Sequence, residues 1–474
     1  MTSARSFRDP TGYVVDASGR VLRVVVDPQA AERLLPILQL GAVERAVTDG
    51  RLVSSRIVPE EEWRELPMLA GLASPPLVLE HERIAFPSYP YEWPPEMLHA
   101  AGQLTLDLAL ALLEEGHGLK DATPYNVLFK GPRPVFVDVA SIEPRDPDDY
   151  TWLPQAQFAR TFLLPLLACR DLGLALSGPA LAKRDGLEPE DLYRMIGPLR
   201  RLRSPYLGLV SLPTWLARAS RKRGATLYQE RRGGHSERSR FIVSALLRRL
   251  THTLDRLPPG GMRRSAWSTY MDADLSYTDA AFGQKEAFVR SVLADQRPTS
   301  VLDVGCNTGH FSALAARSGA SVVAIDSDPV VVGEAWRRAS ADGLGILPLV
   351  VDLSRPSPGI GWRNAECASF LDRAQGGFDL VLMLALVHHL LVTERVPLDA
   401  IVEIAAELTR DSVIVEYVGP DDRCFRQITR GRASLHDSLS PAVFEAAFLR
   451  HFRIARSEPV QGSDRRLYLM TRGA

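Results

Sequence analysis

The spacing of hydrophobic residues predicts an α/β fold for the second half of the chain. From about residue 265 onward, short apolar runs alternate with segments of helical periodicity. The apolar runs, each as long as a buried strand, are 301–305, 321–325, 346–351, 379–384 and 412–417. The helical segments lie near 309–318, 329–341 and 396–408. Such alternation predicts a Rossmann-like, mainly parallel sheet covered by helices on both faces. Phe452–Val460 and Arg466–Met470 add an antiparallel pair at its edge.

The first part of the chain has a different pattern, which predicts an α+β domain over residues 1–150. Two pairs of short strands are expected, Tyr13–Val15 with Val21–Val26 and Val127–Phe129 with Val135–Val139. Between the pairs, Met97–Glu115 is rich in leucine and predicts a long, largely buried helix.

Residues 151–262 predict a helical extension that is rich in arginine. Between Arg194 and Arg264, basic residues far outnumber the acids Glu230, Glu237 and Asp255. Leu257-Pro258-Pro259-Gly260-Gly261 has the composition of a linker, because proline stops a helix and paired glycines give the backbone many conformations. A third domain is therefore expected at 265–474.

Composition narrows the class of protein. A net charge of −1 argues against a globally basic nucleic-acid binder. The four cysteines are scattered without a CxxC pair, which favours a reducing, cytoplasmic setting. The first residues lack the apolar core of a signal peptide, and the apolar runs Phe162–Cys169 and Leu380–Val387 are shorter than the ~20 residues that span a bilayer. No membrane span is expected.

The most informative segment is Val301–Phe311, where a buried strand turns into a helix. This segment contains one acid, Asp303, and two glycines, Gly305 and Gly309. Glycine allows the backbone to approach a ligand closely, and the start of a helix presents unpaired N–H groups to a carboxylate or phosphate. The pattern predicts a small, anionic, adenosine-bearing cofactor.

Two further acids strengthen this prediction. Asp326 ends the next strand, where a carboxylate can accept hydrogen bonds from both ribose hydroxyls. Asp352 follows the strand 346–351 and can accept the amino hydrogen of adenine, although an ordinary loop acid paired with Ser354 is an alternative. Asp328, followed by Pro329, is better explained as a helix N-cap.

With these acids in place, residues 265–474 resemble the class I S-adenosylmethionine-dependent methyltransferases. The resemblance implies that the cofactor is S-adenosylmethionine and that Asp303, Gly305, Asn307 and Gly309 surround its methionine part. Asp303 as a helix-capping acid is the alternative. The full set of cofactor-binding residues that it implies is Asp303, Gly305, Cys306, Asn307, Gly309, Asp326, Asp352, Leu353 and Leu384.

Candidates for catalysis follow the fourth and fifth strands of the predicted sheet. His388 and His389 come after the fourth strand, and histidine can accept the proton that a hydroxyl acceptor loses. His389 is the preferred base, and the alternative is that both rings pack in the core or line the cofactor pocket. Glu416 and Tyr417 end the fifth strand, where they can orient a substrate or hold the histidine. Tyr270 and Tyr277 are candidates for substrate binding and can form a flap over the cofactor, and the alternative is packing between domains.

The N-terminal part carries a second set of chemical residues. Asp121 and Asn126 precede the second strand pair, and Asp138 follows it. An acid, an amide and another acid in this order can position a hydroxyl and hold a divalent metal over phosphates. The segment resembles the catalytic half of the kinase fold, which implies phosphotransfer by Asp121 and Mg²⁺-ATP binding by Asn126 and Asp138. It lacks the family's glycine-rich loop and its strand lysine, and Arg23 is the only basic residue inside the first two strands.

Taken together, a kinase-like segment, a helical middle and a methyltransferase resemble the bacterial nodulation-protein-like methyltransferases. Ser88-Tyr89-Pro90-Tyr91-Glu92-Trp93 and Gly305-Cys306-Asn307-Thr308-Gly309 carry this likeness. We expect methyl transfer to oxygen or nitrogen of a small molecule, specialised metabolite or glycoconjugate, with the kinase-like domain presenting the substrate. The alternatives are an active phosphotransferase in the same chain and a nucleic-acid methyltransferase that uses the arginine-rich block. The sequence leaves the oligomeric state open.

Overall fold

The computed structural model describes residues 9–17, 19–66, 75–221, 236–259, 279–429 and 438–473. The chain divides into two compact units. The N-terminal unit comprises residues 1–262 with 360–367, and the C-terminal unit comprises 263–359 with 368–474. Residues 1–150 and 151–262 therefore share one unit, and their separation into two domains stays a prediction.

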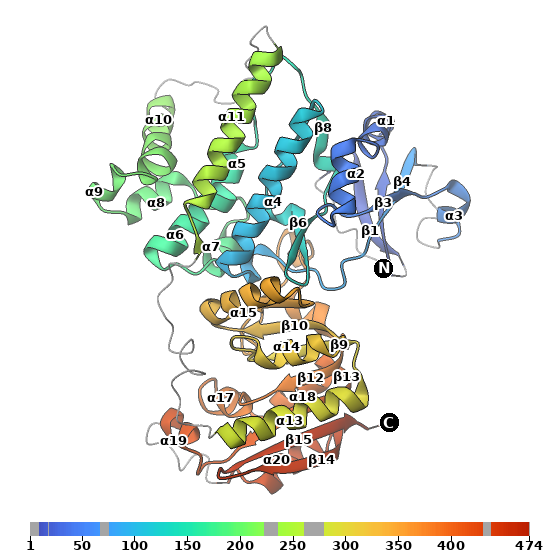
Figure 1. Cartoon of the computed structure of the whole chain (residues 1–474), viewed down its shortest axis with the longest axis vertical. Helices are drawn as coiled ribbons and strands as arrows, with labels where there is room; N and C mark the ends of the chain where they lie inside the picture. The colour runs from blue at the N-terminus through green and yellow to red at the C-terminus, as the bar shows by residue number, and fades with distance from the viewer. Residues whose placement is uncertain are drawn as a thin grey trace. The chain divides into compact units, whose positions relative to one another are not determined.

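The N-terminal unit begins with an antiparallel sheet in the order β1-β2-β4-β3 (Figure 1). Its strands are β1 (Gly12–Ala17), β2 (Arg20–Val25), β3 (Ser55–Ile57) and β4 (Leu77–His81). The predicted first hairpin is confirmed, with Ser18 of its turn outside the described residues. Short helices α1 (Pro28–Ile37), α2 (Gly41–Thr48) and α3 (Glu60–Arg64) accompany the sheet. Alternate residues of β2, such as Leu22 and Val24, pack with Trp63 in a small core because side chains alternate between the faces of a strand.

The long helix expected at 97–115 is confirmed as α4 (Pro95–Glu114). Proline at its first position lacks only an N–H that would have no partner inside the helix. Gly102 lets the Phe162 ring and Leu254 approach the helix backbone closely. The pairs β5 (His117–Leu119) with β8 (Ile142–Pro144) and β6 (Val127–Lys130) with β7 (Arg133–Phe136) come next. The second predicted strand pair is therefore also confirmed, although its second strand begins and ends earlier than predicted.

The rest of this unit is helical. Its helices are α5 (Gln155–Phe158), α6 (Leu164–Leu172), α7 (Ser177–Ala182), α8 (Pro189–Met195), α9 (Pro198–Arg201), α10 (Leu212–Arg221) and α11 (Ser236–Asp255). π-helical turns at Ala159–Leu163 and Leu207–Ser211 lead into α6 and α10, each of which has proline at its second position. Proline cannot donate the usual i to i−4 hydrogen bond, which accounts for the local widening.

The described part of the arginine-rich block is partly used for packing within the unit. Arg201 and Arg218 lie over the Tyr193 ring, with their guanidinium carbons 4.0 and 5.2 Å from its centroid. The preceding helix α8 carries the acids Glu190 and Asp191, whereas α9 and α10 carry arginines and no acidic residue. Within the described ranges, no helix combines the length and the apolar character that crossing a bilayer requires.

The C-terminal unit contains a seven-stranded sheet in the order β11-β10-β9-β12-β13-β15-β14. Its strands are β9 (Ser300–Val304), β10 (Ser321–Asp326), β11 (Ile346–Val350), β12 (Phe378–Met383), β13 (Thr409–Val418), β14 (Phe452–Val460) and β15 (Arg465–Arg472). The first five are parallel, and β15 pairs antiparallel with both β13 and β14. The predicted α/β fold is confirmed, including its antiparallel edge. The chain order reverses between β9 and β12, and the carboxyl edge at such a point is where open α/β sheets bind ligands.

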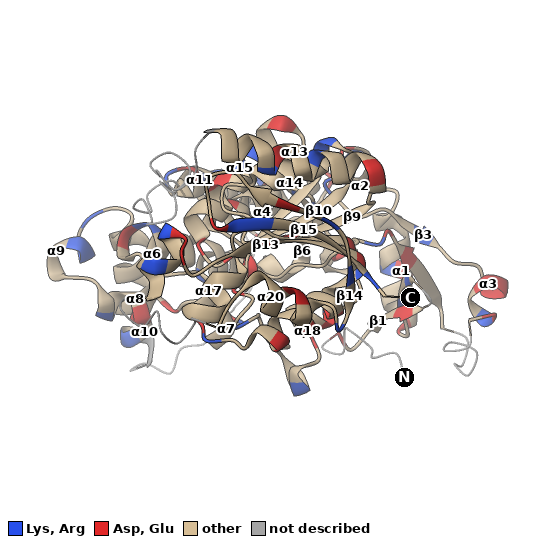
Figure 2. Ribbon diagram, turned by 90° about the horizontal axis from the view of Figure 1, so that it is seen from below, with Lys and Arg blue, Asp and Glu red and all other residues tan. Residues whose placement is uncertain are grey.

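Helices cover both faces of this sheet, as the view of Figure 2 shows edge-on. One face carries α13 (Asp279–Gln296), α14 (His310–Arg317) and α15 (Pro329–Asp342), and the other carries α17 (Val387–Val392), α18 (Leu398–Leu408) and α20 (Pro441–Phe448). The short helices α16 (Phe370–Ala374) and α19 (Arg423–Thr429) complete the unit. Asp328 caps α15 by accepting a hydrogen bond from the Val330 N–H at 2.9 Å, as predicted.

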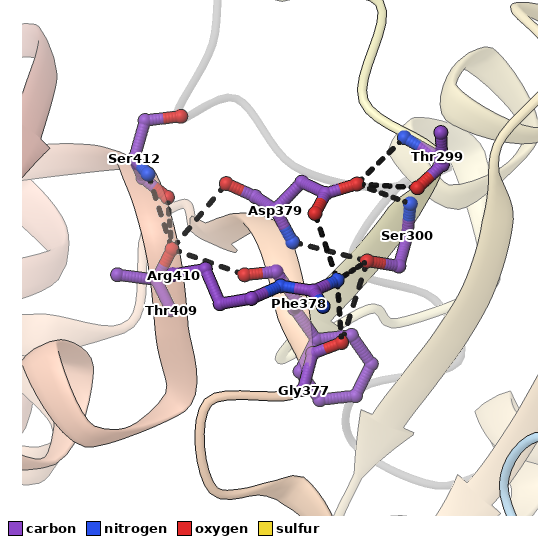
Figure 3. Close-up of polar contacts among 8 residues, drawn as sticks. All are labelled: Thr299, Ser300, Gly377, Phe378, Asp379, Thr409, Arg410 and Ser412. Carbon is purple, nitrogen blue, oxygen red and sulfur yellow. Dashed lines mark hydrogen bonds and ion pairs between the residues drawn. The ribbon is translucent and has the colours of Figure 1, made fainter. Parts of the chain in front are cut away.

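A polar cluster joins three strands at the amino edge of the sheet, opposite the edge where ligands bind (Figure 3). The Asp379 Oδ2 atom accepts hydrogen bonds from Thr299 N and Oγ1 and from Ser300 N, at 2.6–3.0 Å. Its Oδ1 atom lies 2.8 Å from Arg410 Nη2. Burial opposes ionisation of Asp379, but these hydrogen bonds and the Arg410 charge outweigh it and lower its pKa. The cluster thus fixes the start of β12 against β9 and β13.

Candidate functional site

The turn between β9 and α14 has the backbone geometry that its glycines predict. Gly305 and Gly309 have φ of +75° and +82°, which non-glycine residues adopt only with strain. The N–H groups of Gly305 and Cys306 both donate to the Ile325 carbonyl oxygen, at 2.9 and 3.0 Å. The turn is therefore fastened to the end of β10, beside Asp326.

Asp326 links the two strand ends. Its Oδ2 atom accepts a hydrogen bond from Asn307 N and its Oδ1 atom accepts one from Asp328 N, both at 3.0 Å. Burial raises the pKa of Asp326, and these backbone N–H groups oppose the rise. Each oxygen keeps a second lone pair, which fits the predicted role of receiving ribose hydroxyls.

Asp303 lies buried inside the same edge. Its Oδ2 atom accepts a hydrogen bond from Ser312 Oγ at 2.6 Å, which ties it to the first turn of α14 through a side chain. Burial, and secondarily the nearby Asp326 carboxylate, raise the pKa of Asp303 to about 6. Two carboxylates whose pKa values burial raises suit a ligand that brings a cationic group or donates hydrogen bonds.

Asp352 and Leu353 follow β11 at the same edge and are half-buried. The Asp352 carboxylate accepts hydrogen bonds from the Ser354 N and Oγ and from Arg355 Nη2, at 2.6–2.9 Å. These are the local contacts of a loop acid, so its contact with adenine stays a prediction. Burial opposes ionisation of Asp352, but the Ser354 and Arg355 contacts prevail and lower its pKa.

The two histidines lie on α17, immediately after the turn that ends β12. Their ring centroids are 4.2 Å apart. His388 is 2% exposed, and neither of its ring nitrogens has a hydrogen-bond partner among the described residues. Burial, followed by the Arg465 charge, lowers the pKa of His389 to about 4, and burial, followed by the nearby His389, holds the pKa of His388 well below its ordinary value. Both rings are thus neutral at physiological pH, and His389 is the more accessible of the two.

Glu416 is fully buried and is paired with two cationic side chains. Its Oε2 atom lies 2.5 Å from Lys285 Nζ and accepts a hydrogen bond from Ala385 N at 2.8 Å. Arg465 Nη1 lies 3.4 Å from Oε1. Tyr417 points to the other face of the sheet, where its ring packs edge-on against Phe444. The structure therefore surrounds Glu416 with cations and Tyr417 with core residues, and their action on a substrate stays a prediction.

Sequence reasoning missed Lys285, Arg465 and Ser312. Lys285 had a detectable pattern, because it sits on the buried stripe of α13 formed by Ala281, Phe288 and Val292. A lysine at a core position of an amphipathic helix requires a buried acid as its partner. Arg465 had a similar pattern, because it is two residues before the fully buried Leu467 on the same strand, and residues two apart point to the same face of a sheet.

Two predictions lie outside the described residues, namely Tyr270 and Tyr277. Gly260 and Gly261 of the predicted linker lie outside them as well. Leu384 is buried at the end of β12 and packs in the main core with Cys306, so its place near the cofactor turn agrees with the sequence prediction without testing its role.

The N-terminal candidates gather around the hairpin of β6 and β7. Asp121 follows β5 and accepts a hydrogen bond from Gln157 Nε2 at 3.3 Å. Asn126 begins the hairpin, and its Nδ2 atom is buried without a partner among the described residues. Asp138 follows β7 and lies 2.7 Å from Arg23 Nη2, which reaches it from β2. Within the described ranges, no cluster of three or more His, Cys, Asp or Glu side chains could hold a metal.

Comparison with known proteins identifies one domain. Residues 277–452 match a protein family described as a methyltransferase domain. Nodulation protein NoeA of Rhizobium meliloti (strain 1021) is 30% identical over 474 aligned positions, which cover 99% of this chain and 96% of the relative.

Solved structures resemble only part of the chain. A magnesium protoporphyrin IX methyltransferase from Synechocystis PCC 6803 is 19% identical and covers 44% of this chain and 93% of its own, with a TM-score of 0.32. The N-methyltransferase NodS from Bradyrhizobium japonicum WM9 is 13% identical and covers 41% and 99%, with a TM-score of 0.31.

The family match and the sheet order together establish the nature of the C-terminal unit. Five parallel strands with an antiparallel pair at one edge, inside a segment that matches a methyltransferase family, form a class I methyltransferase domain. The predicted methyltransferase fold is confirmed. The kinase-like character of the N-terminal unit stays a prediction.

Proposed function

Since the chain belongs to the family of nodulation protein NoeA and contains a methyltransferase domain, we propose that it is an S-adenosylmethionine-dependent methyltransferase. The acceptor is oxygen or nitrogen of a small molecule, specialised metabolite or glycoconjugate, which the N-terminal unit presents. One observation carries the proposal: the buried carboxylate of Asp303 and the half-buried carboxylate of Asp326 flank a glycine turn at the carboxyl edge where the strand order reverses.

The residues at this edge fit S-adenosylmethionine. The cofactor bears an ammonium group, ribose hydroxyls and an electrophilic sulfonium methyl. Asp303, with its pKa raised to about 6, gains from a nearby cation or donor, and Asp326 has free lone pairs for hydroxyls. A Cβ atom added at Gly305 would meet only the Leu386 side chain, at 3.4 Å or beyond, so the backbone there is open to close approach.

The protein's own part in the reaction is alignment and proton acceptance. Displacement at a methyl carbon demands an acceptor held in line with the sulfur, and this pre-organisation supplies much of the rate. His389 is unprotonated throughout the neutral range because burial and the Arg465 charge lower its pKa to about 4. The same shift makes it a weaker base than a histidine of ordinary pKa, so its role depends on being held close to the acceptor proton. His388 lies on the same helix, α17, and is more deeply buried.

Calorimetry with S-adenosylhomocysteine tests the proposal directly. We expect one site per chain with a dissociation constant in the micromolar range, about −8 kcal/mol. The control is adenosine 5′-triphosphate without metal, which shares the adenosine, lacks the ammonium group and is strongly anionic where S-adenosylhomocysteine is a zwitterion without net charge. No binding of S-adenosylhomocysteine by the folded protein would refute the proposed function.

A second candidate function is phosphotransfer by the N-terminal unit. The ion pair between Arg23 and Asp138 supports it, because kinases place a basic residue from the sheet near the metal-binding acid. Mg²⁺ with ATP should then raise the melting temperature, and Arg23→Met should abolish the shift. If Mg²⁺-ATP did not change the melting temperature, phosphotransfer would be contradicted, and substrate presentation would remain as the proposed role of the N-terminal unit.

A further inference from the structure

The methyltransferase domain contains a buried cluster of charges that its fold alone does not require. Lys285 comes from α13, Glu416 from β13 and Arg465 from β15, and their side chains are 4%, 0% and 1% exposed. Arg465 also holds Asp422, with Nε 2.7 Å from Oδ2 and Nη2 3.0 Å from Oδ1. Two cations and two carboxylates therefore balance each other inside the domain.

Such a cluster is a poor way to stabilise a protein. Moving ions out of water costs several kcal/mol each, and their mutual attraction often only offsets that cost, so apolar side chains of similar size would serve as well. Lys285 Nζ lies 2.5 Å from Glu416 Oε2 and 5.5 Å from the centroid of the Phe311 ring, and the charges of Asp303 from β9 and of Arg465 also act on it. A function beyond stability is therefore the better explanation.

Glu416 is the member of the cluster that reaches the candidate site. Its Oε2 atom accepts the hydrogen bond from Ala385 N at 2.8 Å, in the turn that comes after β12. Ala385 has φ of +51°, a left-handed conformation that costs a non-glycine residue of the order of 1 kcal/mol or more. A strained backbone of this kind persists only where its surroundings hold it.

The strained turn shapes the place where the cofactor is proposed to lie. Leu386, the next residue, is the side chain nearest to where a Cβ of Gly305 would be. α17 then begins at Val387 and carries both histidines. A shift of the Ala385 peptide would therefore move the wall opposite the glycine turn and the candidate base together.

We propose that Lys285 and Arg465 are positioning residues for methyl transfer, which keep the Glu416 carboxylate fixed and charge-balanced so that it holds the Ala385 turn in its strained conformation. This inference rests on the proposed function, since it assigns the turn to the cofactor site. Glu416 accordingly acts through the backbone of Ala385 and does not touch the substrate.

Three variants test the inference, namely Lys285→Met, Glu416→Gln and the double variant. Lys285→Met leaves the Glu416 carboxylate with an incomplete countercharge, and Glu416→Gln removes the carboxylate that lies 2.5 Å from Lys285 Nζ. Each should therefore weaken S-adenosylhomocysteine binding about tenfold or more at pH 7.5. The double variant is charge-balanced again, and the glutamine amide oxygen still accepts from Ala385 N. It should bind within about threefold of wild type, which is strong coupling between the two sites.

The pH profile separates positioning from a merely structural role. Protonation of Glu416 in Lys285→Met removes the same unbalanced charge that glutamine removes. The S-adenosylhomocysteine affinity of Lys285→Met, divided by that of wild type, should therefore rise toward one as the pH falls. The same ratio for the double variant should not change with pH. Besides Lys285 and Arg465, the titratable groups around this carboxylate are Asp303, Asp422 and the two histidines, and all of them remain in every variant.

Asp379→Asn is the matched control, because it removes a hydrogen-bonded carboxylate at the opposite edge of the same sheet (Figure 3). It should lower the melting temperature and leave the affinity of the folded protein unchanged. Lys285→Met binding like wild type, or a double variant as weak as the single ones, would overturn the inference.

Hydrogen exchange at the Ala385 amide tests, without any ligand, whether the buried charges hold the Ala385 turn. Its protection should fall in Lys285→Met and return in the double variant. If wild type fails to bind S-adenosylhomocysteine, the proposed function fails, while the exchange data still confirm or overturn the control of the Ala385 turn by the buried cluster.

Discussion

Replacing Asp326 by asparagine probes the cofactor site at the residue with the best-defined contacts. In the structure each carboxylate oxygen accepts one backbone N–H, from Asn307 and from Asp328, both at 3.0 Å. Asparagine keeps the shape, but its NH₂ group must face one of these N–H donors. One of the two hydrogen bonds is therefore lost, together with the charge that draws ribose hydroxyls.

The expected magnitude comes from that geometry. A hydrogen bond to a charged acceptor contributes about 1.5–3 kcal/mol, and 1.4 kcal/mol corresponds to a tenfold change in affinity. Part of the loss falls on the free protein, because the turn is fastened less firmly. We therefore expect S-adenosylhomocysteine to bind about 10–100-fold more weakly, with a modest fall in melting temperature.

Isothermal titration calorimetry at pH 7.5 is the assay, and Asp328→Asn is its control. That substitution removes the same charge two residues away, but asparagine caps a helix about as well as aspartate, so α15 should survive. Its affinity should match wild type. An Asp326→Asn affinity within twofold of wild type, or an equal loss in Asp328→Asn, would refute the assignment of Asp326 to the ribose.

The other predictions concern protonation, stability and catalysis. The pKa of Asp303 is about 6 in the free protein, and the ammonium group of a bound ligand would lower it, so the affinity for S-adenosylhomocysteine should rise from pH 5 to 7. Titrations in buffers of different ionisation enthalpy should detect proton release near pH 6 that Asp303→Asn abolishes, and a flat profile would contradict this. The pKa of Asp379 is lowered on folding, so the stability that its carboxylate contributes is present above its ordinary pKa and is lost as the pH falls through the lowered value. Asp379→Asn should therefore reduce the free energy of unfolding by about 1–3 kcal/mol at pH 7. If the variant were still less stable than wild type by this amount at about pH 2–3, the ionic contacts would not be the cause. His389→Gln should reduce kcat about 100-fold or more with little change in cofactor affinity, and an unchanged kcat would exclude this histidine as the base.

Much of the fold was predictable because the relevant information is local. Strands buried on both faces give continuous apolar runs, and their carboxyl ends were marked by Asp326 and by the glycines at 305 and 309. The N-cap at Asp328 needed only its neighbours in sequence. The π-helical turns before α6 and α10 were not predicted, although the prolines that accompany them are visible in the sequence.

The sequence by itself determined the order of elements, the class of the domain and the acids at its ligand-binding edge, since periodicity and turn chemistry act over a few residues. Only the tertiary structure decided which charges are buried together. Arg23 meets Asp138 across 115 positions of sequence, and Glu416 joins Lys285 and Arg465 from three separate elements. A charge in a sequence is exposed by default, and only packing shows which carboxylates lose water and therefore need a cation or a ligand to replace it.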